Sequence, residues 1–318
     1  MTEPNLDKDT SSQSLLNQIV VEHFKEKKQK RFWRRWRRIF FTLLVIAFSF
    51  YFFHAYEAEI TARAQTHVGL IDLKGEIFDT QAASADNLSK SLESAYQAKG
   101  LKAVLFRIDS PGGSPVQADY MFNTIRYYHK KYPDVKSYAV CMDTCASAAY
   151  YVAAAADEIY ANPSSLVGSI GVLYNGFGFV DAMQKLGVTR RLETAGRNKG
   201  FMDAFSPIDA TQEKSLKTML TVIHQRFIDQ VKLGRGDRLK PSADLFTGMV
   251  WTGVQAKNLG LIDGFDSTGQ LLRDVIKVET VYDYTEKHSV LDQLAKSLGA
   301  ETMNQLAVVL GIKRPGFH

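Results

Sequence analysis

The chain has 318 residues, 45% of them hydrophobic, which is enough for one large domain or two ordinary ones. Its net charge of +5 is local, because residues 25–38 carry nine Lys/Arg against one Glu and the remainder is slightly acidic. This distribution disfavours a nucleic-acid surface. The two cysteines, Cys141 and Cys145, exclude a disulfide scaffold or a four-ligand zinc site, and they could pair or stay free.

The amino-terminal region predicts a membrane anchor. Residues 1–38 form a polar tail that ends in the basic cluster, and the apolar run 39–56 follows at once. As a helix this run would rise about 27 Å, enough to span a bilayer core. A cleaved signal peptide is the alternative, with Ala62-Arg63-Ala64 as its processing site. It fits less well, because the amino-terminal region is too long and too charged.

The position of the basic cluster also predicts the orientation of the chain. Lys and Arg gather on the cytoplasmic side of a span, so the amino terminus is expected in the cytoplasm and residue 57 onward outside it. We expect a single-pass protein of the inner (cell) membrane, with its larger part in the periplasm if the cell is Gram-negative. Residues 57–66 are polar and helix-permissive, which is typical of a stalk.

The rest of the chain alternates short apolar runs with amphipathic stretches, and this pattern favours an α/β domain with a mostly parallel sheet. We expect this domain over residues 67–283 and a helical extension over 284–318. In a long helix over 211–233, the spacing of Leu216, Leu220, Ile223, Phe227 and Val231 predicts core packing. The other expected elements are strands at 67–75, 102–108, 137–142 and 158–161 and helices at 85–98, 116–131 and through Ala156.

Two turns at the carboxyl ends of expected strands hold the candidate chemistry, since ligand sites in parallel sheets lie beyond those ends. Ser147 opens a run of small residues, which fits either a helix N-cap or a serine held up for nucleophilic attack. Gly112 and Gly113 fit either a tight turn or backbone N–H groups that point into a cleft as an oxyanion hole. A phosphate loop is disfavoured, because neither Gly-Lys-Ser/Thr nor GxGxxG is present.

The base that would activate Ser147 is not evident from the pattern. The seven histidines share no motif, and His129 and His224 lie in mixed polar sequence that is typical of helix surfaces. A Ser/His/Asp triad therefore has no visible support. No metal-ligand spacing occurs, so we expect no metal and no cofactor. A lysine can act as a base where burial lowers its pKa. Lys199, in a glycine-flanked loop, is a candidate, and an exposed loop lysine is the alternative.

Four separated segments together resemble the signal peptide peptidase A family of membrane-anchored serine proteases. They occur in the family's order as RIDSPGGS at 107–114, CASAAYYVAAAADEIYANPSSLVGSIGV at 145–172, AGRNKGF at 195–201 and GMVWTGVQAKNLGLIDGF at 248–265. The resemblance implies a ClpP/crotonase-like fold with one copy of the catalytic unit. It also implies a serine endopeptidase that acts through a Ser/Lys dyad on signal peptides already cut from secreted precursors.

The resemblance also assigns roles to individual residues. The family's nucleophile falls on Ser147 and its general base on Lys199. Its oxyanion hole falls on Gly112 and Gly113, with the N–H of Ala148 as a second donor, and the serine that holds the lysine in place falls on Ser169. The family often has Gly-Gly directly after the nucleophile, where this chain has Ala148-Ala149.

The expected partners follow from the same resemblance: peptide substrates, the membrane and further copies of the chain in a ring-shaped homo-oligomer, with no nucleic acid. Two other hypotheses remain. A crotonase-like acyl-CoA enzyme would share the sheet architecture, although an extracytoplasmic position separates it from its cofactor. A non-catalytic membrane scaffold would use Ser147 only to cap a helix.

Overall fold

The computed structural model describes residues 27, 32–54 and 64–286, which belong to two compact units within residues 1–62 and 63–318. In the first unit Phe32–His54 form one helix of 23 residues, long and apolar enough by length and composition to cross a membrane. This helix begins inside the basic cluster, earlier than the predicted anchor. Most of the predicted tail, most of the stalk and nearly all of the carboxyl-terminal extension lie outside the described residues.

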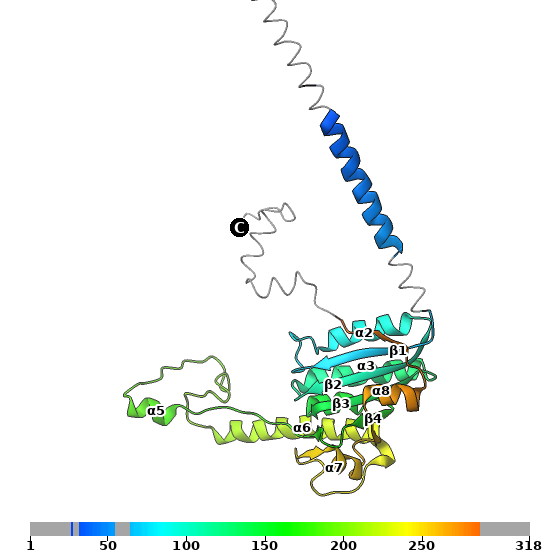
Figure 1. The fold of residues 1–318 in the computed structure, drawn as a ribbon. Coiled ribbons are helices and arrows are strands. Elements are labelled where there is room, and N and C mark those ends of the chain that lie inside the picture. Colours follow the sequence, from blue (N-terminus) through cyan, green and yellow to red (C-terminus); the bar gives the residue numbers. More distant parts are fainter. Residues whose placement is uncertain (1–26, 28–31, 55–63, 287–318) are drawn as a thin grey trace, which may run out of the picture. The chain divides into compact units, whose positions relative to one another are not determined.

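The second unit is built on an eight-stranded sheet in the order β6-β5-β3-β2-β1-β8, with β4 paired to β3 and β7 (Figure 1). Only the β5–β6 pairing is antiparallel among the pairings of these strands. The predicted α/β fold with a mostly parallel sheet is confirmed. The strands are β1 (His67–Lys74), β2 (Leu101–Ser110), β3 (Lys136–Ala146), β4 (Glu158–Ala161), β5 (Leu166–Gly168), β6 (Val250–Thr252), β7 (Gly264–Phe265) and β8 (Val281–Asp283).

Hydroxyl and carboxylate side chains cap the amino-terminal ends of several helices. Ser84 accepts a hydrogen bond from the Asn87 N–H, and Asp209 accepts from Thr211 and Gln212, which satisfies N–H groups that a helix leaves free at its start. The helices are α2 (Ala85–Gln97), α3 (Pro115–Lys131), α4 (Ala148–Ala153), α5 (Val180–Lys185), α6 (Ala210–Arg235), η1 (Gly236–Arg238), α7 (Gly253–Asn258), α8 (Thr268–Gln270) and η2 (Leu271–Ile276).

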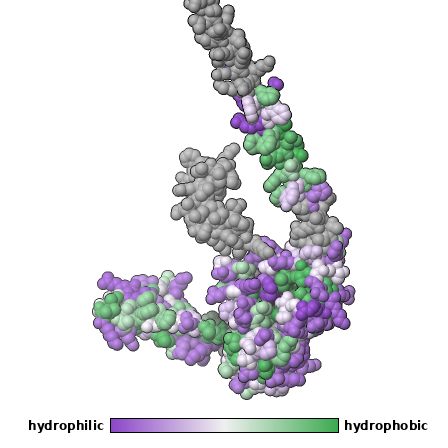
Figure 2. Space-filling view, in the orientation of Figure 1, coloured by the Kyte–Doolittle hydropathy of each residue, from purple (hydrophilic) through white to green (hydrophobic). Residues whose placement is uncertain are grey.

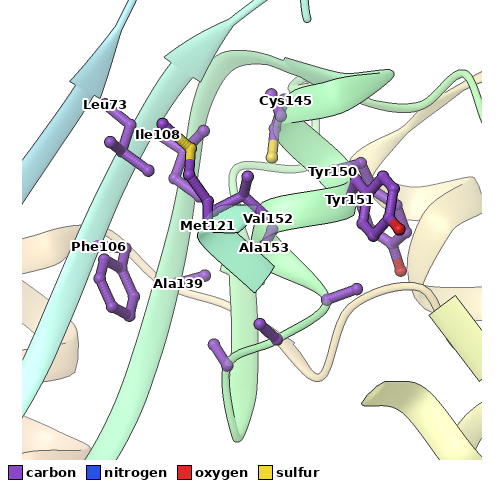
Figure 3. Packing of buried hydrophobic residues seen from close by; sticks show 14 of the residues in the cluster. Leu73, Phe106, Ile108, Met121, Ala139, Cys145, Tyr150, Tyr151, Val152 and Ala153 are labelled. Carbon is purple, nitrogen blue, oxygen red and sulfur yellow. The ribbon is translucent and has the colours of Figure 1, made fainter. Parts of the chain in front are cut away.

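The larger hydrophobic core lies between the sheet and helices α2, α3 and α4, and it surrounds α4 completely. All six residues of α4 are buried. In Figure 3, Val152 and Ala153 of this helix pack beside Met121 of α3 and close to Ile108 of β2. A smaller cluster on the opposite face packs η2 against the sheet through Leu271 and Leu272. The nucleophile candidate thus stands at the start of the most deeply buried helix.

The amino-terminal half of α6 departs from the prediction. Phe227 and Val231 are buried as expected, but in the described chain no residue from Gly171 through Arg226 is buried, which includes Leu216, Leu220 and Ile223. Core packing for those three side chains was therefore a wrong prediction. Figure 1 shows the reason: this half of α6 projects from the sheet together with the segment that carries α5. We call residues 171–209 the arm.

Candidate active site

The strand β3 changes partners just before Ser147. Its first part pairs with β4, up to Cys141 opposite Ala161, and its last part pairs with β5, from Thr144 opposite Leu166. On its other side the register with β2 shifts between Ile108 and Ser110, so β3 carries extra residues there. Such a bulge bends a strand and redirects its end. The side chain of Asp109 accepts a hydrogen bond from the Thr144 N–H at 3.1 Å and so holds the bend.

Ser147 occupies a strained turn between β3 and α4. Its φ of 55° and ψ of −126° lie in a region that a residue with a side chain adopts only at a cost. It stands at the N-cap position, yet its hydroxyl makes no capping hydrogen bond among the described residues. Its N–H donates to the Gly168 carbonyl at 2.8 Å. The bond fixes the backbone of the turn, and within the described residues no capping bond takes up the hydroxyl.

Gly112 lies directly against this turn. A Cβ added to Gly112 would stand 2.7 Å from Ser147 Cβ and 3.1 Å from Ala148 N, so only glycine fits here. Its φ is +114° and that of Gly113 is +153°, which also favours glycine. The Ser110 hydroxyl accepts from the Gly112 N–H at 3.2 Å, and the Gly112 carbonyl accepts from the Ile77 N–H at 2.9 Å. The predicted glycine turn therefore lies beside the predicted nucleophile.

Two backbone N–H groups at this turn are available as donors. The Gly113 N–H has no hydrogen-bond partner in the part of the chain that the structure describes. Ala148 is the first residue of α4, where an N–H has no carbonyl of its own helix to bond. The side chains of Ala148 and Ala149 are 3% and 0% exposed and belong to the core. The two methyl groups that replace the family's glycines therefore face the core.

Ser169 follows β5 and is linked to the same turn. β5 pairs in parallel with β3, Ala146 opposite Gly168, so Ser147 and Ser169 each follow directly on a paired residue. Ser169 has a φ of 52°, and its N–H donates to the Met249 carbonyl at 2.8 Å. The structure thus brings together the segments of Ser147, Gly112, Gly113, Ala148 and Ser169, which the sequence alone could only propose.

Lys199 is not brought to this turn within one chain. It is exposed on the arm, where its N–H bonds the Gly196 carbonyl in a local turn at 3.0 Å. A cavity of about 270 Å³ lies beside it, and Arg197 and Gly200 contribute to its wall, but the lining contains neither Ser147 nor its neighbours. The dyad therefore stays a prediction.

The two cysteines lie in β3 on either side of the bulge. Both are free and buried. Burial, with Cys141 close by, raises the pKa of the Cys145 thiol. The described residues hold no group of three or more His, Cys, Asp or Glu side chains that could bind a metal ion.

Sequence reasoning missed residues that support the site from other elements. Asp109 and Ser110 hold the two turns through the bonds described above, and both lie in the RIDSPGGS segment without a role assigned to them. His224 was expected at a helix surface, but its Nε2 lies 3.0 Å from the Ile170 carbonyl, next to Ser169. The signal for His224 is spatial, because the two residues lie 54 positions apart.

The fold and the serine turn define an α/β protein of the ClpP/crotonase class. The model of peptidase family S49 matches residues 129–280, which include Ser147, Ser169 and Lys199. This match covers a little under half of the chain, and it agrees with the resemblance to signal peptide peptidase A.

Several curated relatives share this part of the chain. "Putative signal peptide peptidase SppA" of Enterococcus faecium is 27% identical over 68% of this chain and 63% of its own length. "Serine protease SPPA, chloroplastic" of Arabidopsis thaliana is 31% identical over 57% and 27%. "Na(+)/H(+) antiporter NhaA" of Brucella abortus is 39% identical over 68% of this chain and 31% of that protein. The chain thus spans less than two thirds of each of these relatives. The word antiporter describes that relative and is not carried over to this chain.

Among solved structures, a serine-to-alanine mutant of "1510-N membrane-bound stomatin-specific protease" aligns with 70% of this chain and 95% of its own, with 16% identity and a TM-score of 0.42.

Proposed function

We propose that this chain is a serine endopeptidase in which Ser147 is the nucleophile and Lys199 the general base. The observation that carries the proposal is the backbone of Ser147, which holds a φ of 55° at the end of β3 without a capping bond from its hydroxyl. Strain of this kind persists where the surroundings enforce it, and it gathers at functional sites. Gly112, packed against Ser147, is part of that enforcement.

The reaction follows the path of an acyl-enzyme. Ser147 Oγ attacks the carbonyl carbon of the substrate while its proton passes to neutral Lys199 Nζ. The N–H groups of Gly113 and Ala148 donate to the oxyanion that forms. The C–N bond then breaks as Lys199 returns the proton to the leaving amine. Water, deprotonated in the same way, finally hydrolyses the ester on Ser147 and regenerates the free hydroxyl.

The proposed substrates are signal peptides that remain in the membrane after their release from secreted precursors. Helix Phe32–His54, long and apolar enough to span a bilayer, would keep the chain at that membrane. With the basic cluster on its amino side, the positive-inside rule would leave the tail in the cytoplasm and the peptidase domain in the periplasm or outside the cell.

The proposed dyad is completed between copies of the chain. A lysine serves as a base where it is held away from water, and Lys199 is exposed in the single chain. The arm around it carries large apolar side chains in water, with Leu173, Phe177 and Leu186 exposed by 79%, 76% and 78%. Figure 2 shows hydrophobic surface mixed with polar surface on this projecting part. Exposed apolar surface of this kind marks an interface, and a homo-oligomer would cover it.

Two alternatives receive less support. The match to peptidase family S49 favours hydrolysis of peptides over the chemistry of a crotonase-like acyl-CoA enzyme. A non-catalytic scaffold would use Ser147 as a helix cap, and within the described residues the hydroxyl makes no capping bond.

The test is peptide cleavage and fluorophosphonate labelling by the full-length chain in detergent. Ser147→Ala and Lys199→Ala should each lower the cleavage rate by about 10⁴-fold or more, because the members of a dyad act as a unit. Ser89→Ala and Lys185→Ala, on exposed residues of α2 and α5, serve as matched controls and should retain full activity. Undiminished cleavage by either dyad variant would falsify the assignment.

A further inference from the structure

The segment Gly168–Ile170 is held at three successive residues by three different parts of the chain. The Gly168 carbonyl accepts from the Ser147 N–H at 2.8 Å, and the Ser169 N–H donates to the Met249 carbonyl at 2.8 Å. The third bond joins His224 Nε2 of α6 to the Ile170 carbonyl at 3.0 Å. The first two bonds are backbone contacts. The third depends on one side chain.

The chemistry of the third bond fixes the role of the imidazole. A carbonyl oxygen only accepts, so His224 Nε2 carries the proton and donates it. Both the neutral ring and the imidazolium can make this bond, because Nε2 carries a proton in each form. Nε2 therefore takes no part in proton transfer while the bond is in place. Nε2 is also unable to accept a proton from Ser147 while it makes this bond. His224 is thus suited to hold a backbone in place.

The segment that it holds is under strain. Ser169 has a φ of 52° and Gly168 a φ of +102°, and a Cβ at Gly168 would lie 2.8 Å from Trp251 Cδ1. A left-handed serine relaxes toward ordinary φ values unless neighbours on both sides prevent it. The bond from His224 lies immediately after Ser169, and the bond to Ser147 lies immediately before it.

We infer that His224 is a positioning residue of the peptidase site, which keeps the Ser169 hydroxyl oriented toward the base that activates Ser147. This inference rests on the proposed function. His224 stands where α6 leaves the core, ahead of Phe227, the first buried residue of the helix. It therefore links the Ser169 turn to the amino-terminal half of α6, which directly follows the arm in the chain.

The first measurement is steady-state cleavage of a soluble peptide by the full-length chain and three variants. His224→Leu should lower kcat by about tenfold, the size of one lost hydrogen bond, with KM unchanged within about twofold. His224→Gln, which places an N–H donor at a similar distance, should recover most of kcat. Gln225, next to His224 in the same helix, donates only to Asp229 in the described chain, so Gln225→Leu is the matched control.

A double-mutant cycle then tests whether His224 acts through Ser169. If it does, Ser169→Ala combined with His224→Leu is no slower than Ser169→Ala alone, because the second change has nothing left to position. Independent, multiplicative losses would overturn the inference.

Amide hydrogen exchange at Ser169 makes the result independent of catalysis. Protection of this N–H, bonded to Met249, should fall in His224→Leu and be kept in His224→Gln and Gln225→Leu. Unchanged protection in His224→Leu overturns the inference even if the enzyme is active. If His224→Leu loses this protection while Ser147→Ala stays active, His224 still positions the turn, and the proposed dyad is rejected.

Discussion

The Tyr151 hydroxyl donates a 2.6 Å hydrogen bond to Asp119 Oδ1, which ties the helix after Ser147 to α3. Arg226 Nε and Gln230 Nε2 of α6 donate to the same oxygen at 3.0 and 3.3 Å. Burial alone would raise the pKa of Asp119, but the bonds from Tyr151 and Arg226 outweigh it and the pKa lies below its ordinary value. One carboxylate thus joins three helices around the candidate active site.

Substitution of Tyr151 and of Asp119 should each destabilise the domain, and the loss should be larger for Asp119. Tyr151→Phe loses one hydrogen bond and should lower the free energy of unfolding by about 1 kcal/mol. Asp119→Ala leaves the Tyr151 hydroxyl and the Arg226 guanidinium without their acceptor and should cost about 2 to 3 kcal/mol. Urea denaturation measures both. Asn123→Ala, which removes an exposed contact to Asp119, is the control. Equal losses in the first two variants would contradict this view of Asp119.

A buried ion pair holds the far end of α6. Arg235 Nη1 and Nη2 lie 2.7 and 2.9 Å from the two carboxylate oxygens of Asp263, and the Arg235 side chain has no exposure to water. Asp263 also accepts from the Ile159 N–H at 2.7 Å, which connects the pair to β4. Burial alone would raise the pKa of Asp263, but the bonds and charge of Arg235 outweigh it and the pKa is lowered.

The stability of the domain should therefore fall in acid through Asp263. Because its pKa is lower in the folded state, the unfolded chain binds more protons between the two values, and stability rises with pH there. The contribution is complete above about pH 4 and is lost as the pH falls through the folded pKa. Asp263→Asn should cost about 3 kcal/mol at neutral pH, since Arg235 stays buried without its counter-ion. Thermal melting from pH 3 to 7 measures both effects, and an unaltered acid slope in the variant would count against them.

The glycine turn gives a prediction that separates crowding from backbone strain. Gly112→Ala would place a Cβ 2.7 Å from Ser147 Cβ, so the nucleophile must move and kcat should fall by about 100-fold. Gly75→Ala is the matched control, because Gly75 has a φ of +78° but no atom within 4 Å of an added Cβ. It should cost about 1 kcal/mol of stability and leave kcat unchanged. A variant of Gly112 with normal kcat would place the nucleophile elsewhere.

The sequence predicted most of the elements of the fold because each rests on local information. The predicted strands and helices from residue 67 to 161 are present in the structure, with β2 and β3 longer than expected and α4 ending at Ala153, three residues before the predicted end. An apolar run ends at Met142, but β3 continues to Ala146 since β5 supplies a new partner. No local pattern encodes that exchange of partners.

The sequence pattern did not predict the arm. The spacing of Leu216, Leu220 and Ile223 indicates an apolar face on α6, without showing whether the same chain covers it. His224 was assigned to the surface for a similar reason, because its contact to Ile170 spans 54 positions. In the proposed mechanism, the roles of Lys199 and of the arm depend on a second copy, which a single chain does not supply.

A complementation experiment tests this dependence. Chains with Ser147→Ala and chains with Lys199→Ala are co-expressed under different affinity tags, and mixed oligomers are isolated by both tags. If each dyad joins two copies, one ordered neighbour pair in about four combines an intact serine with an intact lysine, so cleavage returns to about a quarter of the wild-type rate. If each dyad lies within one copy, mixed oligomers stay inactive, because every site lacks one group. Leu186→Lys on the exposed face of the arm should abolish the recovery, since a charge there opposes burial between copies. Lys185→Ala, beside it in α5, should leave the recovery intact.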